Sequence, residues 1–190
     1  MTMSYNTRRY LLDTDLLARI RFRANSTDVY KGIIALIQGG QVRTVRQVLK
    51  ELKYFKGPYQ ILSPLKDAFL VPLAEQYCGG VQTLIEYLGN NASCLWEQTG
   101  AKDPDPADPW LIAVAHTHGY TLVTNESRRS GNTLRAACRL PQIRCRCIHG
   151  LFFLYEAGLI PRASAVSRSV LDIVEATHRN NDNRLVARER

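Results

Sequence analysis

Residues 105–126, DPADPWLIAVAHTHGYTLVTNE, predict a helix that is followed at once by a strand. Asp108 and Pro109 form a typical helix start, an acidic cap followed by proline. Largely apolar residues follow, and Gly119 stands where a helix commonly ends. Residues 120–124, YTLVT, are rich in β-branched and aromatic side chains and predict a short buried strand. This helix–strand pair constrains the rest of the fold more than any other segment.

The lengths of these two elements bring their outer ends together. A helix of about ten residues spans roughly 15 Å, and a strand of about five residues spans roughly 17 Å. If the two pack antiparallel through the glycine turn, Asp108 at the helix start and Glu126 after the strand lie at one edge of a sheet. Like charges at close range disfavour each other's ionisation. A divalent metal ion is the usual reason for such a pair of carboxylates.

Composition describes a globular chain without a membrane segment. Its 190 residues suit one domain with a substantial core. Hydrophobic residues make up 45% of the chain, and no apolar run approaches the ~20 residues that span a bilayer. Residues 1–9 lack the apolar core of a signal peptide. The five cysteines lack the spacing of a disulfide framework, so we expect a reducing, cytoplasmic location.

The net charge of +8 favours a polyanionic partner. No acidic residue stands between Glu126 and Glu156, and this segment holds six arginines: Arg128, Arg129, Arg135, Arg139, Arg144 and Arg146. Arginine forks bind phosphate oxygens in pairs. We therefore expect Arg128 and Arg129, the two nearest the acidic pair, to bind substrate. A solvated basic surface is the alternative.

The first strand of the chain also ends in a carboxylate. Residues 10–12 predict an apolar strand that is followed by Asp13, and Thr14 or Asp15 is expected to cap the next helix. A later helix, residues 46–55, carries Glu51 close to its apolar side.

Strands and helices alternate along the rest of the chain. Helices are expected at 28–38, 73–88 (with an interruption at 79–80), 133–139 and 151–157, strands at 41–45 and 144–148, and a loop at 89–103. This alternation predicts a three-layer α/β/α sandwich with a mainly parallel central sheet. Active groups of such sheets gather at the carboxyl ends of the strands, so Asp13 is expected at the same edge as Asp108 and Glu126.

Four motifs resemble, in order, those of PIN domains: YLLDTDLL at 10–17, VLKEL at 48–52, DPWLIA at 108–113 and LVTNE at 122–126. They are similar above all to the DUF4411 branch, in which a DPWLIA-type helix precedes a strand ending in V-T-x-E. The resemblance covers roughly residues 9–160. It implies a PIN-like nuclease domain at 1–160, followed by a C-terminal helix and polar tail at 161–190.

PIN domains are metal-dependent ribonucleases, and many are toxins of bacterial toxin–antitoxin pairs. The resemblance implies that Asp13, Glu51, Asp108 and Glu126 are catalytic and hold Mg²⁺ or Mn²⁺. Asp15 stands where many members have asparagine, so it is a further candidate ligand or a helix cap. Glu126 stands where many members have aspartate, and its longer arm could bind the metal ion through water. Each of these acids could instead be a cap or a surface residue.

The expected substrate is RNA, hydrolysed at a phosphodiester bond. The Thr124 hydroxyl is expected to orient a phosphate or a water, although a packing role in the strand is the alternative. Residues 164–178 predict an amphipathic helix whose apolar stripe must be covered. It could pack on its own domain, pair with a second copy in a homodimer, or bind a protein antitoxin.

Two other functions fit some of the residues. Asp13-x-Asp15 after an apolar strand also resembles the nucleophile motif of haloacid-dehalogenase-type phosphohydrolases. That family has Thr or Val where Leu17 stands, and it has a later acidic pair that we do not find here. The other alternative is a non-catalytic nucleic-acid-binding module that retains the PIN-like fold. The four acids in place argue against it.

Overall fold

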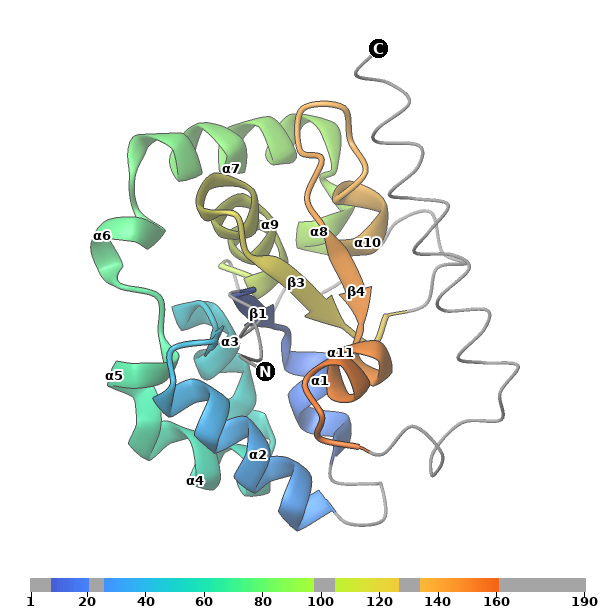
Figure 1. The fold of residues 1–190 in the computed structure, drawn as a ribbon. Coiled ribbons are helices and arrows are strands. Elements are labelled where there is room, and N and C mark those ends of the chain that lie inside the picture. Colours follow the sequence, from blue (N-terminus) through green and yellow to red (C-terminus); the bar gives the residue numbers. More distant parts are fainter. Residues whose placement is uncertain (1–7, 21–25, 98–104, 127–133, 161–190) are drawn as a thin grey trace. The chain divides into compact units, whose positions relative to one another are not determined.

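The computed structural model describes residues 8–20, 26–97, 105–126 and 134–160 (Figure 1). The chain divides into two compact units, residues 1–150 and residues 151–190. The first unit holds the sheet and all the acidic residues singled out above. Each unit is described by itself.

The sheet of the first unit has four strands, all parallel, in the order β2-β1-β3-β4. The strands are β1 (Tyr10–Leu12), β2 (Val42–Arg43), β3 (Thr121–Thr124) and β4 (Cys147–His149). Tyr10 pairs with Thr121, and Leu122 pairs with Cys147. The predicted parallel sheet is therefore confirmed, with β1 and β3 as its two central strands.

Helices occupy most of the remaining described chain. They are α1 (Thr14–Arg19), α2 (Ser26–Gln38), α3 (Arg46–Glu51), η2 (Leu52–Tyr54), α4 (Lys56–Leu62), η3 (Ser63–Leu65), α5 (Lys66–Phe69), α6 (Leu73–Gln76), α7 (Gly79–Asn91), α8 (Cys94–Glu97), α9 (Ala107–His118) and α10 (Leu134–Ala137). The last element of the described residues, α11 (Gly150–Glu156), begins where the first unit ends.

The helices cover the sheet on both faces. The chain moves from β1 outward to β2, and then in the opposite direction from β2 to β3 and on to β4. Because parallel crossovers are right-handed, this reversal puts α1 and α2 on one face and α9 and α10 on the other. Figure 1 shows the sheet between these groups of helices, consistent with the predicted α/β/α sandwich.

Helix α9 and strand β3 form the predicted helix–strand pair. Leu111, Ile112, Ala113 and Val114 are fully buried, as are Leu122 and Val123 in the strand. Burial on every side explains why α9 is apolar around nearly its whole circumference. Gly119, with φ of 68°, ends the helix in the left-handed region that favours glycine. The Tyr120 N–H then donates to the Ala115 carbonyl at 3.0 Å, so the chain turns directly into β3.

Two expectations for the helical middle of the chain need correction. The helix expected at 46–55 ends at Glu51 and continues only as the 3-10 turn η2. The loop expected from residue 89 begins later, because α7 runs to Asn91 and α8 follows at 94–97. The Leu88 side chain is fully buried, and this packing outweighs the low helix propensity of Gly89 and of the two asparagines after it.

The second unit is described only from residue 151 to residue 160. Its helix, the body of α11, ends with hydrogen bonds from the Ala157 N–H to the Phe153 carbonyl at 2.8 Å and from the Gly158 N–H to the Tyr155 carbonyl at 3.0 Å. Gly158, with φ of 70°, makes a left-handed turn directly after the helix. The amphipathic helix expected at 164–178 lies outside the described residues. No helix in the described ranges is long and apolar enough to cross a membrane.

Gly150 is the glycine whose replacement we expect to cost most. A Cβ atom at this position would overlap the Leu16 Cδ1 atom and the Asn125 Oδ1 atom. Leu16 is itself buried and has little room to move. We predict that Gly150→Ala lowers the free energy of unfolding by about 1–3 kcal/mol, the usual cost of overpacking a core. Chemical denaturation with urea measures the change.

Gly89→Ala is the matched control, because nothing lies within 4 Å of a Cβ atom at that position. Gly89 is exposed in α7, so alanine there should stabilise the protein by up to about 1 kcal/mol. Equal stability of Gly150→Ala and the parent protein would contradict the close approach of the chain to Leu16 and Asn125.

Candidate active site

Asp13 lies at the carboxyl end of β1, next to the central strand β3. Its backbone N–H donates to the Val123 carbonyl at 3.0 Å, and its side chain is only 4% exposed. The Thr124 hydroxyl donates to the Asp13 Oδ2 atom at 2.6 Å. Thr124 thereby fixes the orientation of a carboxylate that would otherwise be buried without a partner.

Asp108 lies in the first turn of α9 and not at its cap, where the sequence suggested it. The helix begins one residue earlier, at Ala107, and the cap position belongs to Pro106. The groups that act most strongly on the Asp108 carboxylate are all acidic, and no hydrogen bond from a described residue is among them. Asp108 was expected to cap α9, but neither of its carboxylate oxygens binds the start of that helix.

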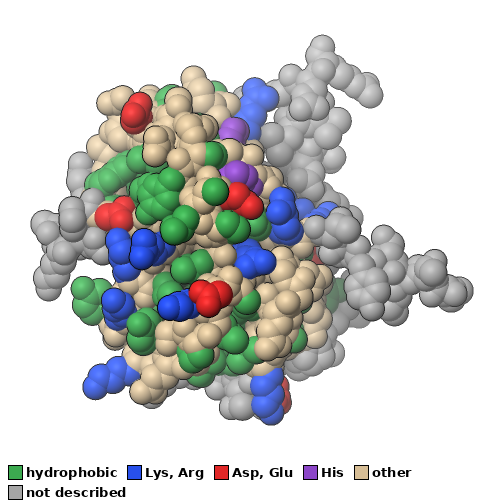
Figure 2. Space-filling view, turned by 90° about the vertical axis from the view of Figure 1, so that its left-hand side faces the viewer, with side chains coloured by type: hydrophobic (Ala, Val, Ile, Leu, Met, Phe, Trp, Pro, Cys, Tyr) green, Lys and Arg blue, Asp and Glu red, His purple; other side chains and the backbone are tan. Residues whose placement is uncertain are grey.

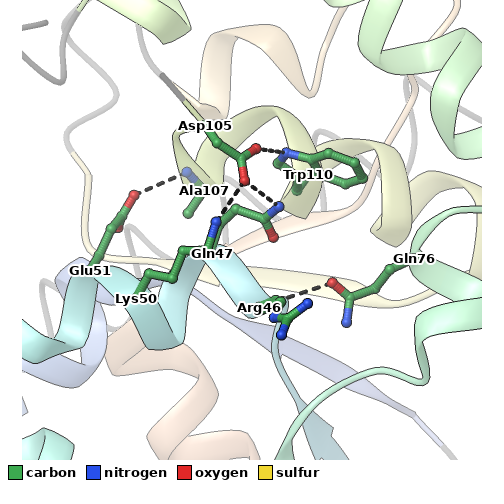
Figure 3. Close-up of polar contacts among 8 residues, drawn as sticks. All are labelled: Arg46, Gln47, Lys50, Glu51, Gln76, Asp105, Ala107 and Trp110. Atoms are coloured by element: carbon green, nitrogen blue, oxygen red, sulfur yellow. Dashed lines mark hydrogen bonds and ion pairs between the residues drawn. The ribbon is translucent and has the colours of Figure 1, made fainter. Parts of the chain in front are cut away.

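Glu51 joins the two elements that carry Asp13 and Asp108. Its Oε1 atom accepts a hydrogen bond from the Ala107 backbone N–H at 3.0 Å, as Figure 3 shows. Its Oε2 atom accepts one from the Thr14 hydroxyl at 2.5 Å. The carboxylate thus binds the positive, N-terminal end of α9, where a negative charge is favoured, and it also binds the residue that follows Asp13.

Glu126 follows β3 at the same edge of the sheet. Its Oε2 atom accepts a hydrogen bond from the Leu134 backbone N–H at 2.9 Å. Its own backbone N–H donates to the Thr124 hydroxyl at 3.1 Å. Thr124 therefore contacts two of the four candidate acids. The buried Arg135 side chain lies beside Glu126 and donates to its carbonyl at 3.5 Å.

Burial and mutual repulsion act together on these carboxylates. Burial is the main cause that raises the pKa of Asp13 from its ordinary 3.8 to about 7, with further contributions from the charges of Glu126, Glu51 and Asp15. Burial likewise raises the pKa of Asp108 well above its ordinary value, and the charges of Asp13 and the other acids add to the effect. Burial also raises the pKa of Glu126.

These mutual effects mean that the fold gathers five carboxylates at one edge of the sheet: Asp13, Asp15, Glu51, Asp108 and Glu126. They come from residues far apart in the sequence, at the ends of two central strands, the start of α1, the end of α3 and the start of α9. Convergence of this kind is the arrangement that parallel α/β sheets use for their active sites.

A sixth acid, Asp105, was not singled out by the sequence. It has more polar partners than the other acids of this region. Figure 3 shows its carboxylate between α3 and α9. It accepts hydrogen bonds from Gln47 Nε2 at 3.0 Å and from Trp110 Nε1 at 2.5 Å, and the Lys50 Nζ atom lies 2.9 Å away. The hydrogen bonds from Lys50, Gln47 and Trp110 outweigh partial burial and lower the pKa of Asp105.

The position of Asp105 explains how α3 and α9 are held in register. Lys50 and Gln47 lie on α3, beside Glu51, and Trp110 lies on α9, beside Asp108. A carboxylate that binds both helices therefore fixes the relation between two candidate catalytic acids. The start of α3 has its own support, because the Gln76 Oε1 atom accepts the Arg46 N–H at 3.2 Å (Figure 3).

The residues expected to bind substrate are Arg128, Arg129 and Thr124. Arg128 and Arg129 lie outside the described residues. Thr124 is described and is fully buried, and its hydroxyl contacts the Asp13 carboxylate and the backbone N–H of Glu126. The expectation that this hydroxyl orients a phosphate or a water stays a prediction.

The donor chemistry of the site suits a hard divalent cation. Carboxylate oxygens are the ligands that Mg²⁺ and Mn²⁺ prefer, and the strongest charges acting on Asp13 and Asp108 are all negative.

The carboxylates are nevertheless turned toward protein donors. Among the described residues, no three Asp, Glu, His or Cys side chains stand in an arrangement that could hold a metal ion as they are. Asp13, Glu51 and Glu126 each accept at least one hydrogen bond from the protein. The set fits a divalent cation by charge and by atom type, and binding would require at least one of these side chains to rotate.

The fold and this edge define an α/β protein with an acidic cluster at the carboxyl ends of a parallel sheet. The chain belongs to the family described as "Domain of unknown function (DUF4411)", whose sequence model matches residues 10–157. That match spans every strand and all five clustered acids. A comparison with curated proteins finds no match to the chain.

We predict that Asp105→Ala destabilises the protein by about 1–3 kcal/mol, since it leaves Gln47 and Trp110 without their acceptor. Denaturation measures the loss. Trp110 fluorescence provides a local signal, because the indole N–H loses its carboxylate partner.

Asp28→Ala is the control for this change. Asp28 is exposed, and its partner among the described residues is Lys31, at 3.5 Å, one turn along α2. Exposed pairs of this kind contribute no more than about 0.5 kcal/mol. If Asp105→Ala were as mild as Asp28→Ala, Asp105 would not be what holds α3 and α9 in register.

Proposed function

We propose that this chain is a metal-dependent endoribonuclease of the PIN type that hydrolyses RNA phosphodiester bonds. The observation that carries the proposal is the gathering of Asp13, Glu51, Asp108 and Glu126 at one edge of the sheet, close enough for the charges of Glu51 and Glu126 to add to the raised pKa values of Asp13 and Asp108. Such a cluster disfavours its own ionised state unless a cation neutralises it. The four motifs that resemble PIN domains contain these same four acids.

The charge of the whole chain supports a nucleic-acid substrate. The net charge is +8, although the proposed site itself is acidic. A polyanion can approach an acidic site only when basic groups elsewhere offset the repulsion. The arginines between Glu126 and Glu156 are candidates for that task, among them the exposed Arg139 and Arg144.

The residues that would hold Mg²⁺ or Mn²⁺ are Asp13, Asp108, Glu126 and Glu51, with Asp15 as a further candidate. A bound divalent ion supplies an activated water and stabilises charge on the phosphate. The chain's own part is to keep the carboxylates at a fixed edge. Thr124 holds Asp13 and the backbone of Glu126, while the start of α9 holds Glu51.

We predict that Asp108→Asn abolishes Mg²⁺- or Mn²⁺-dependent RNA cleavage and at the same time stabilises the metal-free protein. A pKa raised by burial and like charges means that folding disfavours the ionised carboxylate. The neutral amide removes that penalty, about 1.4 kcal/mol for each unit by which the pKa is raised. Cleavage should fall by more than about 100-fold, since a metal ligand is lost.

Thermal unfolding in EDTA and in Mn²⁺ measures the stability half of this prediction. Mn²⁺ should raise the melting temperature of the parent protein and not that of Asp108→Asn. The advantage of the variant in EDTA should shrink as the pH falls toward the ordinary pKa of 3.8, where the carboxyl is already protonated in the folded protein. Asp67→Asn, at an exposed position of α5, is the control and should change neither property. Full cleavage activity in Asp108→Asn would refute the proposal.

We further predict that Arg128 and Arg129 contribute affinity and not chemistry. These residues lie outside the described ranges, so the prediction rests on the sequence. Replacing both by alanine should weaken RNA binding and reduce its salt dependence, by a slope of about 0.7 for each phosphate contact to a single strand. Binding titrations at several salt concentrations test this. An unchanged slope would leave both arginines as solvated surface.

The resemblance also supports a role as the toxin of a bacterial toxin–antitoxin pair, acting in the cytoplasm with a protein antitoxin as partner. A small adjacent reading frame for a DNA-binding antitoxin would favour this role over housekeeping RNA processing. A folded protein that binds RNA but cleaves none in Mg²⁺ or Mn²⁺ would instead be a non-catalytic binding module.

A further inference from the structure

Four consecutive exposed residues follow the site on the α3 side: Lys53, Tyr54, Phe55 and Lys56. We call them the KYFK segment. Tyr54 is 80% exposed and Phe55 is 43% exposed, although both carry large aromatic rings. Tyr54 is the most exposed large hydrophobic residue of the described chain. Two neighbouring aromatic rings in solvent, with a lysine on each side, are a pattern that the fold itself does not require.

The backbone of the KYFK segment is held in place by its neighbours. Leu52 before it and Leu62 after it are fully buried, and Pro58 is buried in the first turn of α4. The Phe55 N–H donates to the Leu52 carbonyl at 2.8 Å, and the Tyr59 N–H donates to the Phe55 carbonyl at 3.0 Å. The backbone is therefore fixed before any ligand arrives, so the entropy cost of ordering it on binding is small.

The KYFK segment is also close to the proposed catalytic edge. Glu51 is the last residue of α3, and Tyr54 ends the 3-10 turn that follows directly. At a rise of about 2 Å per residue, the two Cα atoms are about 6 Å apart along the helix axis. The KYFK segment thus begins two residues after a candidate catalytic acid.

The charged residues between Glu51 and Asp67 in the sequence are all basic. They include Lys53, Lys56 and Lys66, which are exposed. Figure 2 views the side of the molecule on which α4, α5 and α6 lie in Figure 1, and it shows Lys and Arg side chains interspersed with hydrophobic ones and with some Asp and Glu side chains. The KYFK segment itself, with two rings and two lysines, is complementary to an anion with flat apolar parts.

We propose that the KYFK segment is a binding platform for single-stranded nucleic acid, with bases stacked on Tyr54 and Phe55 and phosphates bound by Lys53 and Lys56. Surfaces that bind single strands combine aromatic rings with basic groups in this way. Protein–protein interfaces are enriched in aromatic residues but depleted in lysine. Bases in a duplex are already stacked, so exposed rings favour an unpaired strand. The proposal deepens the proposed ribonuclease function and rests on it for the identity of the substrate.

Binding in EDTA tests the platform without any cleavage. The probes are a fluorescein-labelled 12-nucleotide oligouridylate, an abasic ribose-phosphate oligomer of the same length and the corresponding oligodeoxyuridylate, measured by fluorescence anisotropy. The double variant Tyr54→Ala, Phe55→Ala should weaken oligouridylate binding by at least about 30-fold, since stacking contributes about 1–3 kcal/mol per base and two stacked bases are lost. It should leave the affinity for the abasic oligomer unchanged.

The lysines should behave differently. Lys53→Gln with Lys56→Gln should weaken the binding of both oligomers and reduce the salt slope by about 1.4, or about 0.7 for each phosphate contact. Leu73→Ala, at a 56% exposed apolar residue of α6, is the control for lost apolar surface. Lys31→Gln, at an exposed residue of α2, is the control for lost charge. Neither control should alter binding.

Several outcomes would overturn the platform: unchanged oligouridylate affinity in the aromatic variant, or an equal loss for the abasic oligomer. A change in molecular mass by light scattering in that variant, with binding intact, would make the segment a protein interface instead. The single change Tyr54→Ala guards against misfolding, because a side chain that is 80% exposed supports little of the core. The deoxy probe tells whether RNA or DNA is preferred on the platform.

Failure of this inference is separable from failure of the proposed function. If the platform binds single strands as described but no metal supports cleavage, only the ribonuclease proposal fails. If cleavage depends on Asp108 but binding is indifferent to Tyr54 and Phe55, only the platform fails.

Discussion

Repulsion among carboxylates at the edge of the sheet is the constraint that shapes the rest of this structure. Asp13 is almost completely buried, and this burial, together with the charges of the acids around it, raises its pKa to about 7. A fold that concentrates negative charge in this way is destabilised by it, so each acid needs local support. Thr124 supports Asp13, Thr14 and the Ala107 N–H support Glu51, and the Leu134 N–H supports Glu126. Thr124, Thr14 and Ala107 belong to β3, α1 and α9, which also deliver acids of the cluster, whereas Leu134 belongs to α10.

The two helices at this edge depend on each other. The start of α9 donates its first N–H to Glu51, and the positive end of the helix dipole faces acidic side chains. Asp105 then ties α9 to α3 through Trp110 on one side and Gln47 and Lys50 on the other. The pKa of Asp105 is lowered whereas the pKa values of Asp13 and Asp108 are raised. Of these three acids, Asp105 has its negative charge stabilised by protein groups alone, whereas Asp13 and Asp108 do not.

The parts of the fold that depend on local sequence patterns could be predicted from the sequence. The helix–strand pair at 105–126 was predictable because an apolar run, a glycine and a β-branched run are each local signals. The convergence of Asp13 with Asp108 followed from the rule that parallel strands present their carboxyl ends at one edge. The structure supports both, through the register of β1 with β3 and the charge of Asp13 that acts on Asp108.

Contacts between distant side chains were not predictable from such patterns. Asp108 looked like a helix cap because Asp-Pro commonly is one, yet the helix starts at Ala107, where Glu51 from another helix accepts the first N–H. Asp105 had no local signal beyond the proline after it, since its partners lie on α3, more than fifty residues earlier, and on the next turn of the chain. Thr124 resembled an ordinary strand residue, and only the tertiary fold shows that its hydroxyl serves two acids.

An acidic edge and a basic chain are compatible only if the two kinds of charge are kept apart. Lys50, which is nearest the edge on α3, is neutralised by Asp105 at 2.9 Å and so does not cancel the charge of the cluster. The next basic residues along the chain, Lys53 and Lys56, lie beyond Glu51 and are exposed. Because exposed charges are screened within about 8 Å at physiological salt, lysines on the outer side of this surface can attract a polyanion while the buried acids remain available to a cation. The acids and the lysines are separated over a short stretch of chain, and this depends on where α3 ends. Because α3 ends at Glu51, the Glu51 carboxylate lies on the inner side and the KYFK segment lies on the outer side.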